Sequence, residues 1–211
     1  TGTICSGNVA TLSVSGASSY SWSTGSTSAN ISTTPSVTTT YSVTGTTSGC
    51  TSTALTTVSV NPSPIVNIAG TSALCTGQSA SLIASGASSY SWNTGATTNS
   101  ITTSPTITTT YSVTGTDPNG CSSTTAQLVS VAASLSVTIT GPSSICVGQT
   151  ATLTGNGGAT YTWNTGATSS SLALTPSVTT TYSIIGSSGT CSNTNVKTVT
   201  VNPTPTVSVS G

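Results

Sequence analysis

Six cysteines are the residues of this chain whose type and spacing could do chemistry, because thiols form disulfides, bind metals or act as nucleophiles. They form two sets, Cys5, Cys75 and Cys146, and Cys50, Cys121 and Cys191. An even number of cysteines at recurring spacing is typical of a disulfide framework in a secreted protein. Metal binding is disfavoured, because a structural zinc site needs grouped ligands and these cysteines are widely spaced singles.

We expect each disulfide to close within one copy of a sequence repeat. The expected pairs are Cys5–Cys50, Cys75–Cys121 and Cys146–Cys191. Small domains usually close their own bonds, and a loop of this length contributes about 4 kcal/mol in the chain-entropy model. Because the cysteines border turns, the bonds are expected near one pole of each domain rather than across its core. The alternative pairing joins neighbouring repeats, for example Cys50 with Cys75.

Other reactive groups are scarce. The 211 residues include one acid, Asp117, one base, Lys197, and no histidine. Acid–base catalysis needs positioned ionisable groups, a calcium site needs several carboxylates, and nucleic-acid binding needs a basic face. We therefore expect no enzyme activity, no cofactor, no metal site and no nucleic-acid partner. No apolar run is long enough to predict a membrane span.

The cysteines belong to a pattern that occurs three times. A tryptophan follows the first cysteine by 17 positions, a proline follows it by 13 more, and a tyrosine by 6 more. These are Trp22, Trp92 and Trp163, Pro35, Pro105 and Pro176, and Tyr41, Tyr111 and Tyr182. The second cysteine follows the tyrosine by 9, 10 and 9 positions. The extra residue falls in TDPNGC (116–121), and because turns tolerate insertions and paired strands do not, it predicts a hairpin loop there.

Most segments alternate apolar and polar residues with period two, which indicates half-buried strands. In VTTTYSV, for instance, Val37, Tyr41 and Val43 share one face. Ser and Thr together number 94, and they supply the opposite, solvent-facing positions. About seven short strands in about 70 residues, without helical periodicity, indicate a small antiparallel β-sandwich. The expected fold class is all-β, with three such sandwiches in tandem, arranged end to end.

Each sandwich has one tryptophan and two tyrosines as its only large side chains. We expect the tryptophans and Tyr41, Tyr111 and Tyr182 to form the cores, because a tryptophan that recurs once per sandwich is typical of a core position. A carbohydrate-stacking platform of tryptophans is the alternative. A threonine face that binds ice or mineral is a weaker one, since threonine is a common strand former. Asn30-Ile31-Ser32 matches the N-glycosylation sequon.

The landmarks divide the chain into residues 1–61, 62–132 and 133–202, followed by 203–211 as the start of a further repeat. The first strand of 1–61 is expected to come from sequence equivalent to 203–211. Read circularly, Cys191 to Cys5 is 25 positions, which is also the spacing of Cys50 to Cys75 and of Cys121 to Cys146. The chain therefore reads as a slice of a longer array, or one unit of a polymer.

The period, the SYSW.TG segment and the closing P.(V/I)TTTYSV.G…GC resemble bacterial immunoglobulin (Ig)-like and PKD-like tandem repeats. Such repeats occur in very large surface proteins of Bacteroidota, including gliding-type adhesins, and as stalks of secreted enzymes. The resemblance covers all three copies. It implies Ig-like sandwiches, an extracellular or cell-surface location and a role as spacer or adhesive fibre. It supplies no catalytic residue.

Together these observations predict a structural extracellular fibre or adhesin stalk. Its expected partners are copies of itself or adjacent repeats. The alternatives are a module that binds a surface or a glycan, and a non-catalytic stalk of a larger secreted enzyme. The near absence of charge favours association, because net charge near zero removes the repulsion that keeps copies apart.

Overall fold

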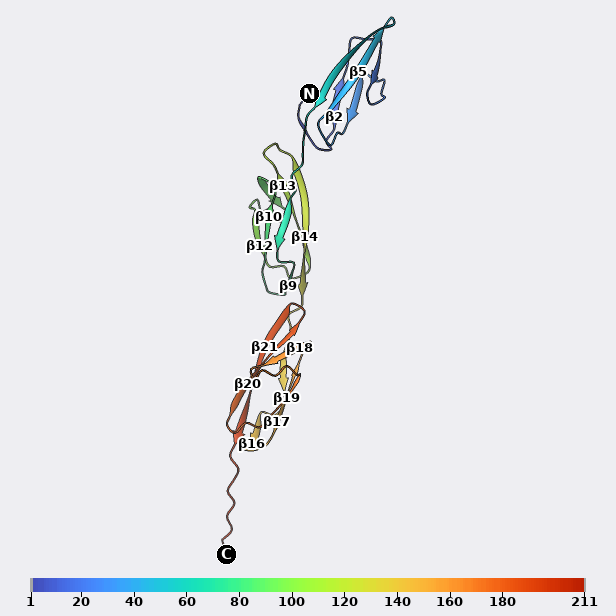
Figure 1. Cartoon of the computed structure of the whole chain (residues 1–211). Coiled ribbons are helices and arrows are strands. Elements are labelled where there is room, and N and C mark those ends of the chain that lie inside the picture. The colour runs from blue at the N-terminus through green and yellow to red at the C-terminus, as the bar shows by residue number, and fades with distance from the viewer. Residues whose placement is uncertain (1, 211) are drawn as a thin grey trace. The chain divides into compact units, whose positions relative to one another are not determined.

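The computed structural model of the chain describes residues 2–210, and within that range every regular element is a β-strand (Figure 1). No helix in residues 2–210 could cross a membrane. We call residues 1–61 repeat 1, 62–132 repeat 2 and 133–202 repeat 3. The predicted domain boundaries remain a prediction. By contacts the chain separates into two compact units, residues 1–70 with 82–101 and 111–127, and residues 71–81 with 102–110 and 128–211.

The same succession of strands recurs in each repeat. Repeat 1 contains β1 (Ile4–Cys5), β2 (Ala10–Ser13), β3 (Ser19–Trp22), β4 (Asn30–Thr33), β5 (Thr39–Thr47), β6 (Cys50–Val58) and β7 (Val60–Asn61). Repeat 2 contains β8 (Asn67–Gly70), β9 (Ala73–Cys75), β10 (Ala80–Ser85), β11 (Ser89–Trp92), β12 (Ser100–Thr103), β13 (Thr109–Thr116) and β14 (Ser122–Ala132). Repeat 3 contains β15 (Thr138–Thr140), β16 (Ser144–Cys146), β17 (Ala151–Asn156), β18 (Thr160–Trp163), β19 (Ser171–Leu174), β20 (Thr180–Ser188) and β21 (Cys191–Asn202).

Each of repeats 2 and 3 has one three-stranded and one four-stranded sheet. In repeat 3 the orders are β15-β17-β19 and β16-β21-β20-β18, and in repeat 2 they are β12-β10-β8 and β11-β13-β14-β9. The short β16 runs parallel to the last strand, β21, while β20 and β21 form a long antiparallel hairpin. Two sheets of three and four strands, antiparallel except for this short parallel pair, have the strand division of an Ig-like sandwich. The all-β, tandem Ig-like fold expected from the sequence is therefore confirmed.

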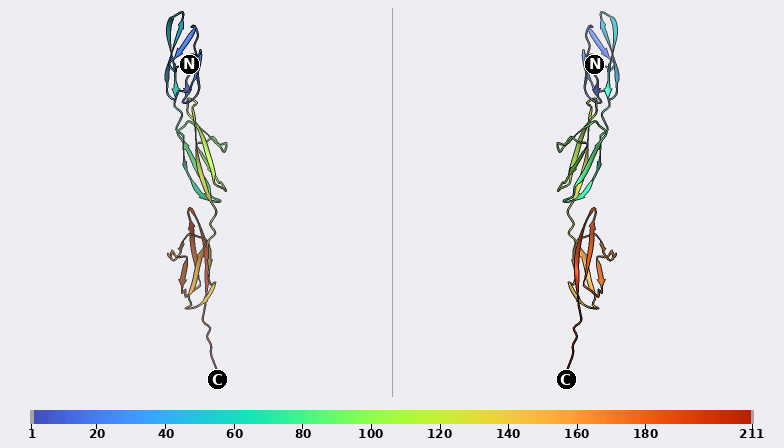
Figure 2. Two further views of the ribbon diagram at one scale, coloured as in Figure 1. Left: turned by 90° about the vertical axis from the view of Figure 1, so that its right-hand side faces the viewer. Right: turned by 90° about the vertical axis from the view of Figure 1, so that its left-hand side faces the viewer.

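The core follows from the alternation of side chains along the strands. In repeat 3, Ala151, Leu153, Trp163, Ile184 and Val199 are buried together, and β17 begins with a strict alternation of buried and exposed positions. All three tryptophans and Tyr41, Tyr111 and Tyr182 are buried, as the alternation predicts. Figure 2 shows the strands that carry them from two further sides.

Two details of the strand prediction have different outcomes. Val37 is exposed rather than internal, because it precedes β5 and so does not share the alternation of Tyr41 and Val43. The loop predicted at TDPNGC is confirmed, since β13 ends at Thr116 and β14 begins at Ser122. The extra residue of repeat 2 therefore lies in a turn and leaves the register of its strands unchanged.

Repeat 1 differs from the other two in both sheets. The counterpart of their four-stranded sheet is divided into β3-β5-β6 and the separate pair β1-β7. In its other sheet, β2 pairs with β4 alone, whereas β10 also pairs with β8, and β17 also pairs with β15. The sheet that has three strands in repeats 2 and 3 thus has two strands within the described part of repeat 1. Among residues 2–210, no strand equivalent to β8 or β15 pairs with the outer edge of β2.

Candidate functional site: disulfide joints and a strand groove

Two disulfides join consecutive repeats. Cys5 bonds to Cys121 and Cys75 bonds to Cys191, with Cα atoms 5.5 and 5.6 Å apart. Each bond links the first cysteine of one repeat to the second cysteine of the next, across 116 positions. The pairing predicted within repeats is wrong for all three pairs, Cys5–Cys50, Cys75–Cys121 and Cys146–Cys191. The alternative of bonds between neighbouring repeats is correct in kind, but the cysteines in its example, Cys50 and Cys75, are not partners.

The physical reason is the length of the last strand. Cys191 is the first residue of β21, and Cys146 lies opposite its last residue, Asn202. These positions are separated by about 11 residues of extended chain, or roughly 36 Å. A disulfide spans a Cα–Cα distance of about 4.4–6.8 Å. The two cysteines of one repeat therefore lie at opposite poles of the sandwich, and only a neighbouring repeat can bring a partner to either one.

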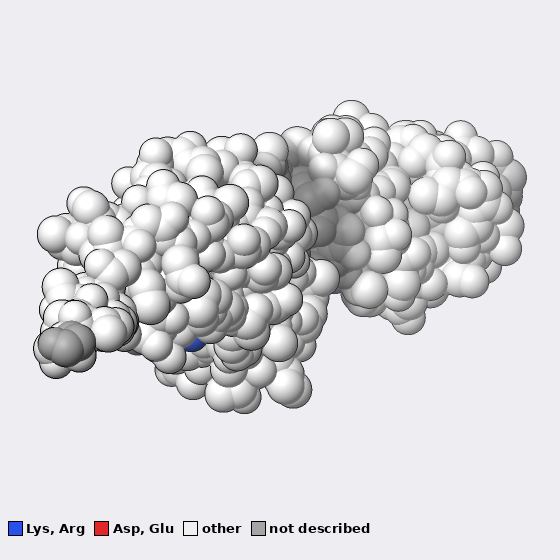
Figure 3. Space-filling model, turned by 90° about the horizontal axis from the view of Figure 1, so that it is seen from below, with Lys and Arg blue, Asp and Glu red and all other residues white. Residues whose placement is uncertain are grey.

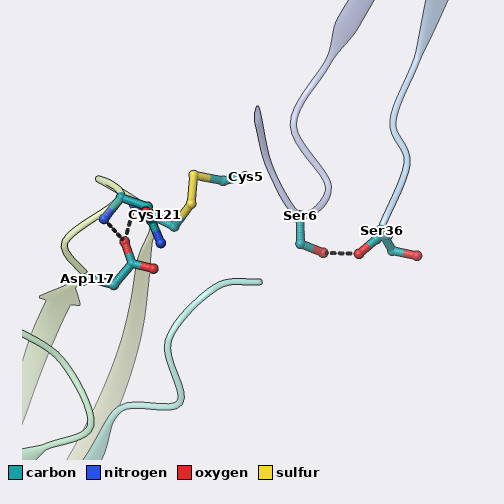
Figure 4. The surroundings of a disulfide bond; sticks show 6 residues. Cys5, Ser6, Ser36, Asp117 and Cys121 are labelled. Atoms are coloured by element: carbon teal, nitrogen blue, oxygen red, sulfur yellow. Dashed lines mark hydrogen bonds between the residues drawn. A yellow bond between two sulfur atoms is a disulfide. The ribbon is translucent and has the colours of Figure 1, made fainter. Parts of the chain in front are cut away.

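A polar turn holds Cys121 in position for its bond. The carboxylate Oδ1 of Asp117 accepts hydrogen bonds from the backbone N–H groups of Asn119, at 2.9 Å, and Cys121, at 2.8 Å. The Asp117 N–H donates to the carbonyl of Cys121 at 2.9 Å. Figure 4 shows this turn beside the bond to Cys5. The only acid of the chain thus organises the loop that forms a joint between repeats.

The remaining two cysteines, Cys50 and Cys146, are free and exposed. Their equivalents in bonded positions are more enclosed. Those of Cys50 are Cys121, 1% exposed, and Cys191, 3% exposed, and one of those of Cys146 is Cys75, 8% exposed. Cys50 and Cys146 are the second cysteine of repeat 1 and the first cysteine of repeat 3. In the pattern of the two bonds, the partner of Cys50 would come from a repeat before repeat 1 and the partner of Cys146 from a repeat after repeat 3.

The segments that open repeats 2 and 3, residues 62–66 and 133–137, which we call the linkers, cover a groove in each sandwich. Val66 is 7% exposed, and its Cγ2 lies 2.6 Å from where a Cβ on Gly115 would stand. A Cβ on Gly86 would collide with the carbonyl oxygen of Ile65. In repeat 3, Val137 covers Gly186 in the same way, at 2.6 Å. These glycines admit the linker strand because they have no side chain.

Side-chain amides add to the hold on the linker in repeat 3. The Nδ2 atoms of Asn193 and Asn195, both on β21, donate hydrogen bonds of 2.7 Å to the carbonyls of Leu135 and Val137. The linker of repeat 3 is therefore held in two ways. The strand β15 that follows it pairs with β17, and these amides bind two of the linker's own carbonyls. Backbone pairing combined with apolar contacts is how an added strand completes a sheet.

The equivalent groove of repeat 1 is open. The glycines that correspond to Gly86 and Gly115 are Gly16 and Gly45. A Cβ on Gly16 would meet no atom within 4 Å, and the nearest atoms to one on Gly45 belong to Ala17 and Tyr20 of repeat 1 itself. Here a cavity of about 350 Å³ lies just beyond the end of β2, beside β3, β5 and β6. Its lining includes Val14, Gly16, Tyr20, Val43, Gly45 and Cys50.

A segment of matching sequence lies unpaired after repeat 3. Residues 203–210, PTPTVSVS, correspond to PSPIVNIA at 62–69, so Val207 matches Val66 and Val209 matches Ile68. Val207 is 88% exposed and Val209 is 95% exposed. The segment pairs with no strand among the described residues, and it extends beyond β21 alone in both views (Figures 1 and 2). The recurring glycines at 16, 86 and 157 and at 45, 115 and 186 were the sequence signal for this groove.

The other candidate residues have structural explanations. The indole N–H groups of Trp22, Trp92 and Trp163 donate to the carbonyls of Ser28, Thr98 and Ser169 at 2.8–2.9 Å. Being buried, the tryptophans offer no stacking platform to a sugar. Threonine hydroxyls bond to one another across strands, as Thr40 with Thr57 at 2.8 Å and Thr181 with Thr198 at 2.8 Å.

The surface carries almost no charge. In Figure 3 the one basic side chain, Lys197, is the small blue area, and no red atom of an acidic side chain is visible on this face. Lys197 lies on β21 opposite Tyr182 in the strand register. No cluster of three His, Cys, Asp or Glu side chains that could hold a metal ion occurs within residues 2–210.

Comparison with known proteins yields structural likeness only. No protein-family model and no curated protein sequence matches the chain. Among solved structures, it is similar to three N-terminal domains of the outer capsid protein Hoc of bacteriophage RB49, with 14% identity and a TM-score of 0.40 over 96% of each chain. It is similar to Sidekick-1 immunoglobulin domains 1–5 at 16% identity and TM-score 0.35, over 95% of this chain. It is also similar to the N-terminal eight Ig domains of Down Syndrome Cell Adhesion Molecule, at 12% identity and a TM-score of 0.42, over 96% of this chain.

The chain spans 58% of the Sidekick-1 structure and 36% of the Down Syndrome Cell Adhesion Molecule structure. By their names, the Sidekick-1 and Down Syndrome Cell Adhesion Molecule structures consist of several Ig domains, and the Hoc structure consists of three N-terminal domains. None of them supports the origin in Bacteroidota that the sequence resemblance implied. At these identities the likeness concerns the fold.

Proposed function

We propose that the protein is a structural component of an extracellular fibre or surface stalk, built of tandem Ig-like sandwiches and without catalytic activity of its own. The observation that carries this proposal is the covalent joint between consecutive repeats, Cys5–Cys121 and Cys75–Cys191. A bond within a repeat would stabilise that repeat alone. A bond between repeats keeps the two repeats together under tension, which is what a stalk requires.

The two disulfide loops overlap, and this shortens the path along which tension passes. The shortest covalent route between Cys5 and Cys191 crosses one bond, follows the chain from Cys121 back to Cys75, and crosses the other bond. It contains about 46 residues in place of about 186, or roughly 160 Å of extended chain in place of roughly 650 Å. Both linkers between repeats lie inside the loops, so neither linker can extend freely while the bonds persist.

Location and surface chemistry support the same role. Disulfides form and persist in oxidising environments, which favours an extracellular or cell-surface site. With one acid and one base in 211 residues, the surface has little to bind phosphate, a charged substrate or a metal ion. The glycan-binding alternative loses its candidate residues, because the tryptophans are buried.

Pulling single molecules from their two ends tests the proposal. The oxidised chain should reach a fully extended length near that of about 70 residues, and the reduced chain that of about 210 residues. The decisive variant is Cys75→Ser with Cys191→Ser, which removes one joint. It should lengthen the oxidised chain by about 24 residues, or roughly 80 Å.

Two results would argue against the proposal. Equal extension of oxidised and reduced chains would show that no bond carries tension. A gain of about 91 residues in the double variant would show that both lost cysteines had closed loops within their own repeats, leaving the linkers free. The matched control is Cys50→Ser, which should leave the extension of the oxidised single chain unchanged because Cys50 is free.

A further inference from the structure

The loop at 116–121 holds the one acid of the chain directly before a proline. Asp117 is the only acidic residue, so Asp117–Pro118 is the only bond in the chain that joins an aspartate to a proline. The corresponding hairpin loops of repeats 1 and 3 contain neither an acid nor a proline, and they are one residue shorter. Pro118, Asn119 and Gly120 are exposed, so water can reach this bond.

Three hydrogen bonds fix the groups around this bond. Oδ1 of Asp117 accepts the N–H groups of Asn119 and Cys121, at 2.9 and 2.8 Å, which hold the carboxylate against the backbone of the turn (Figure 4). The carbonyl oxygen of Asp117, which belongs to the bond to Pro118, accepts the N–H of Gly120 at 3.1 Å. A donor at this oxygen stabilises the negative charge that develops there when the carbonyl carbon is attacked.

We propose that Asp117–Pro118 is a self-cleavage site, at which the Asp117 carboxylate attacks its own backbone carbonyl and the chain opens between β13 and β14. Attack within one residue needs no encounter between separate reactants, and the held carboxylate is already in place. Pro118 supplies the leaving group, because the nitrogen of its tertiary amide carries no hydrogen and departs as a secondary amine. The reaction occurs once per chain and turns over no substrate, so it goes beyond the proposed function without making the protein an enzyme.

The reaction balances with water as its only co-reactant. Because two N–H groups hold Oδ1, Oδ2 is the oxygen that attacks the Asp117 carbonyl carbon, and a cyclic anhydride forms. The C–N bond to Pro118 breaks, and the nitrogen takes up a proton from the medium. Water then opens the anhydride, leaves Asp117 with a side-chain and a terminal carboxylate, and returns protons to the medium. Nothing is oxidised or reduced.

Both disulfides bridge this site. Cys5 and Cys75 precede Asp117, whereas their partners Cys121 and Cys191 follow it. Cleavage therefore yields the pieces 1–117 and 118–211 joined by two bonds. Either bond alone is enough to keep the pieces together.

Cleavage changes the path of tension without parting the chain. The shortest covalent route between Cys5 and Cys191 in the intact chain runs between Cys121 and Cys75, through the bond that breaks. Two routes remain after cleavage, through residues 5–75 and through residues 121–191, each about 70 residues long. The fully extended oxidised chain therefore lengthens by about 24 residues, or roughly 80 Å, and two parallel segments share the load.

The test incubates the whole oxidised chain in a warm, mildly acidic buffer with protease inhibitors, because acid supplies the proton for the leaving nitrogen. On a denaturing gel we expect one band without reducing agent, and the additional fragments 1–117 and 118–211 with it. Sequencing of the second fragment should begin at PNGCSS. Asp117→Asn, which keeps the Oδ1 acceptor of the turn, and Pro118→Ala should each lower the rate of cleavage at least tenfold.

The chain contains matched controls for this chemistry. Asn61–Pro62 and Asn202–Pro203 place an amide of the same length before a proline, and both bonds should stay intact. The rate should not depend on the concentration of the chain, because the attack occurs within one residue. The free peptide TGTDPNGCSS has the same bond without the hairpin that holds the turn, and it should cleave at least threefold more slowly than the folded chain.

A variant tests the bridging separately. In Cys75→Ser with Cys191→Ser, the fragments should still migrate together without reducing agent, because Cys5–Cys121 joins them.

Three outcomes would overturn the inference. The first is a chain that stays whole on the reducing gel while the free peptide breaks. The second is cleavage that persists in Asp117→Asn or is equal at the two Asn–Pro bonds, which would mean unspecific hydrolysis. The third is fragments of the double cysteine variant that separate without reducing agent. The first two leave the pulling experiment on the intact chain unaffected, because that experiment depends only on the disulfides, and its failure would not alter the cleavage seen on the reducing gel.

Discussion

The Cγ2 methyl of Val66 lies 2.6 Å from where a Cβ on Gly115 would stand. This linker valine therefore occupies the space that a side chain at position 115 of β13 would need. Val207 occupies the equivalent sequence position after repeat 3, and it is 88% exposed. Val66 and Val207 therefore allow a matched comparison between a linker valine that is buried against a sandwich and an exposed valine at the equivalent sequence position.

Val66→Ala should lower the free energy of unfolding by about 1–3 kcal/mol, because it removes buried methyl groups and leaves a cavity. Val207→Ala in a dilute solution of the chain should change it by less than about 0.5 kcal/mol, because an exposed side chain loses no packing. Chemical denaturation of both variants measures the difference. Equal losses would show that the linker strand does not pack as described.

Asp117→Ala should destabilise the turn that carries Cys121. The carboxylate accepts two backbone hydrogen bonds in the structure, at 2.9 and 2.8 Å. Their loss should cost about 1–3 kcal/mol and should make the Cys5–Cys121 bond easier to reduce. Asp117→Asn keeps the Oδ1 acceptor and should restore most of the stability. If Asn and Ala variants behaved alike under dithiothreitol titration, the turn would not depend on this acceptor.

The tryptophans should report a buried environment. Their side chains are 2–4% exposed, so acrylamide should quench their fluorescence weakly, and soluble oligosaccharides should leave the emission unchanged. Trp163→Phe should cost about 1–3 kcal/mol, since it removes buried area and leaves the carbonyl of Ser169 without its indole donor. A marked emission shift on addition of a glycan would reopen the glycan-binding alternative.

Thermal stability should depend little on salt. Asp117 and Lys197 are the only acidic and basic side chains, so screening between about 20 and 300 mM NaCl has few interactions to weaken. The melting temperature should move by less than about 5 °C, which corresponds to about 1 kcal/mol in a domain of this size. A larger shift, followed by calorimetry, would show that electrostatic interactions matter more than the composition indicates.

Sequence patterns predicted the parts of this fold that depend on local alternation. Trp22 and Tyr41 are buried because they occupy inward positions of strands, and the loop at Asp117 lies where the repeat gains a residue. The disulfide pairing failed because spacing along the chain does not tell which pole of a sandwich a cysteine occupies. The parallel pairing of β1 with β7 puts Cys5 opposite Asn61, far from Cys50, and only the sheet topology reveals it.

The groove in repeat 1 could be predicted only in part from the sequence. The sequence predicts that the first strand of repeat 1 comes from sequence equivalent to 203–211. It does not show which side chains such a strand would cover, because Gly16 and Gly45 read as ordinary turn or strand glycines until Val66 and Val137 are seen above their equivalents.

Mapping the disulfides of the oxidised chain is the most direct test of the covalent joints between repeats. Digestion without reduction, followed by mass spectrometry, should yield peptides that join Cys5 to Cys121 and Cys75 to Cys191. The chain should be alkylated before digestion, so that Cys50 and Cys146 carry the label in dilute monomer. Peptides that join Cys5 to Cys50 or Cys146 to Cys191 would contradict the account, because each repeat would then close its own bond and nothing covalent would hold neighbouring repeats together except the linkers.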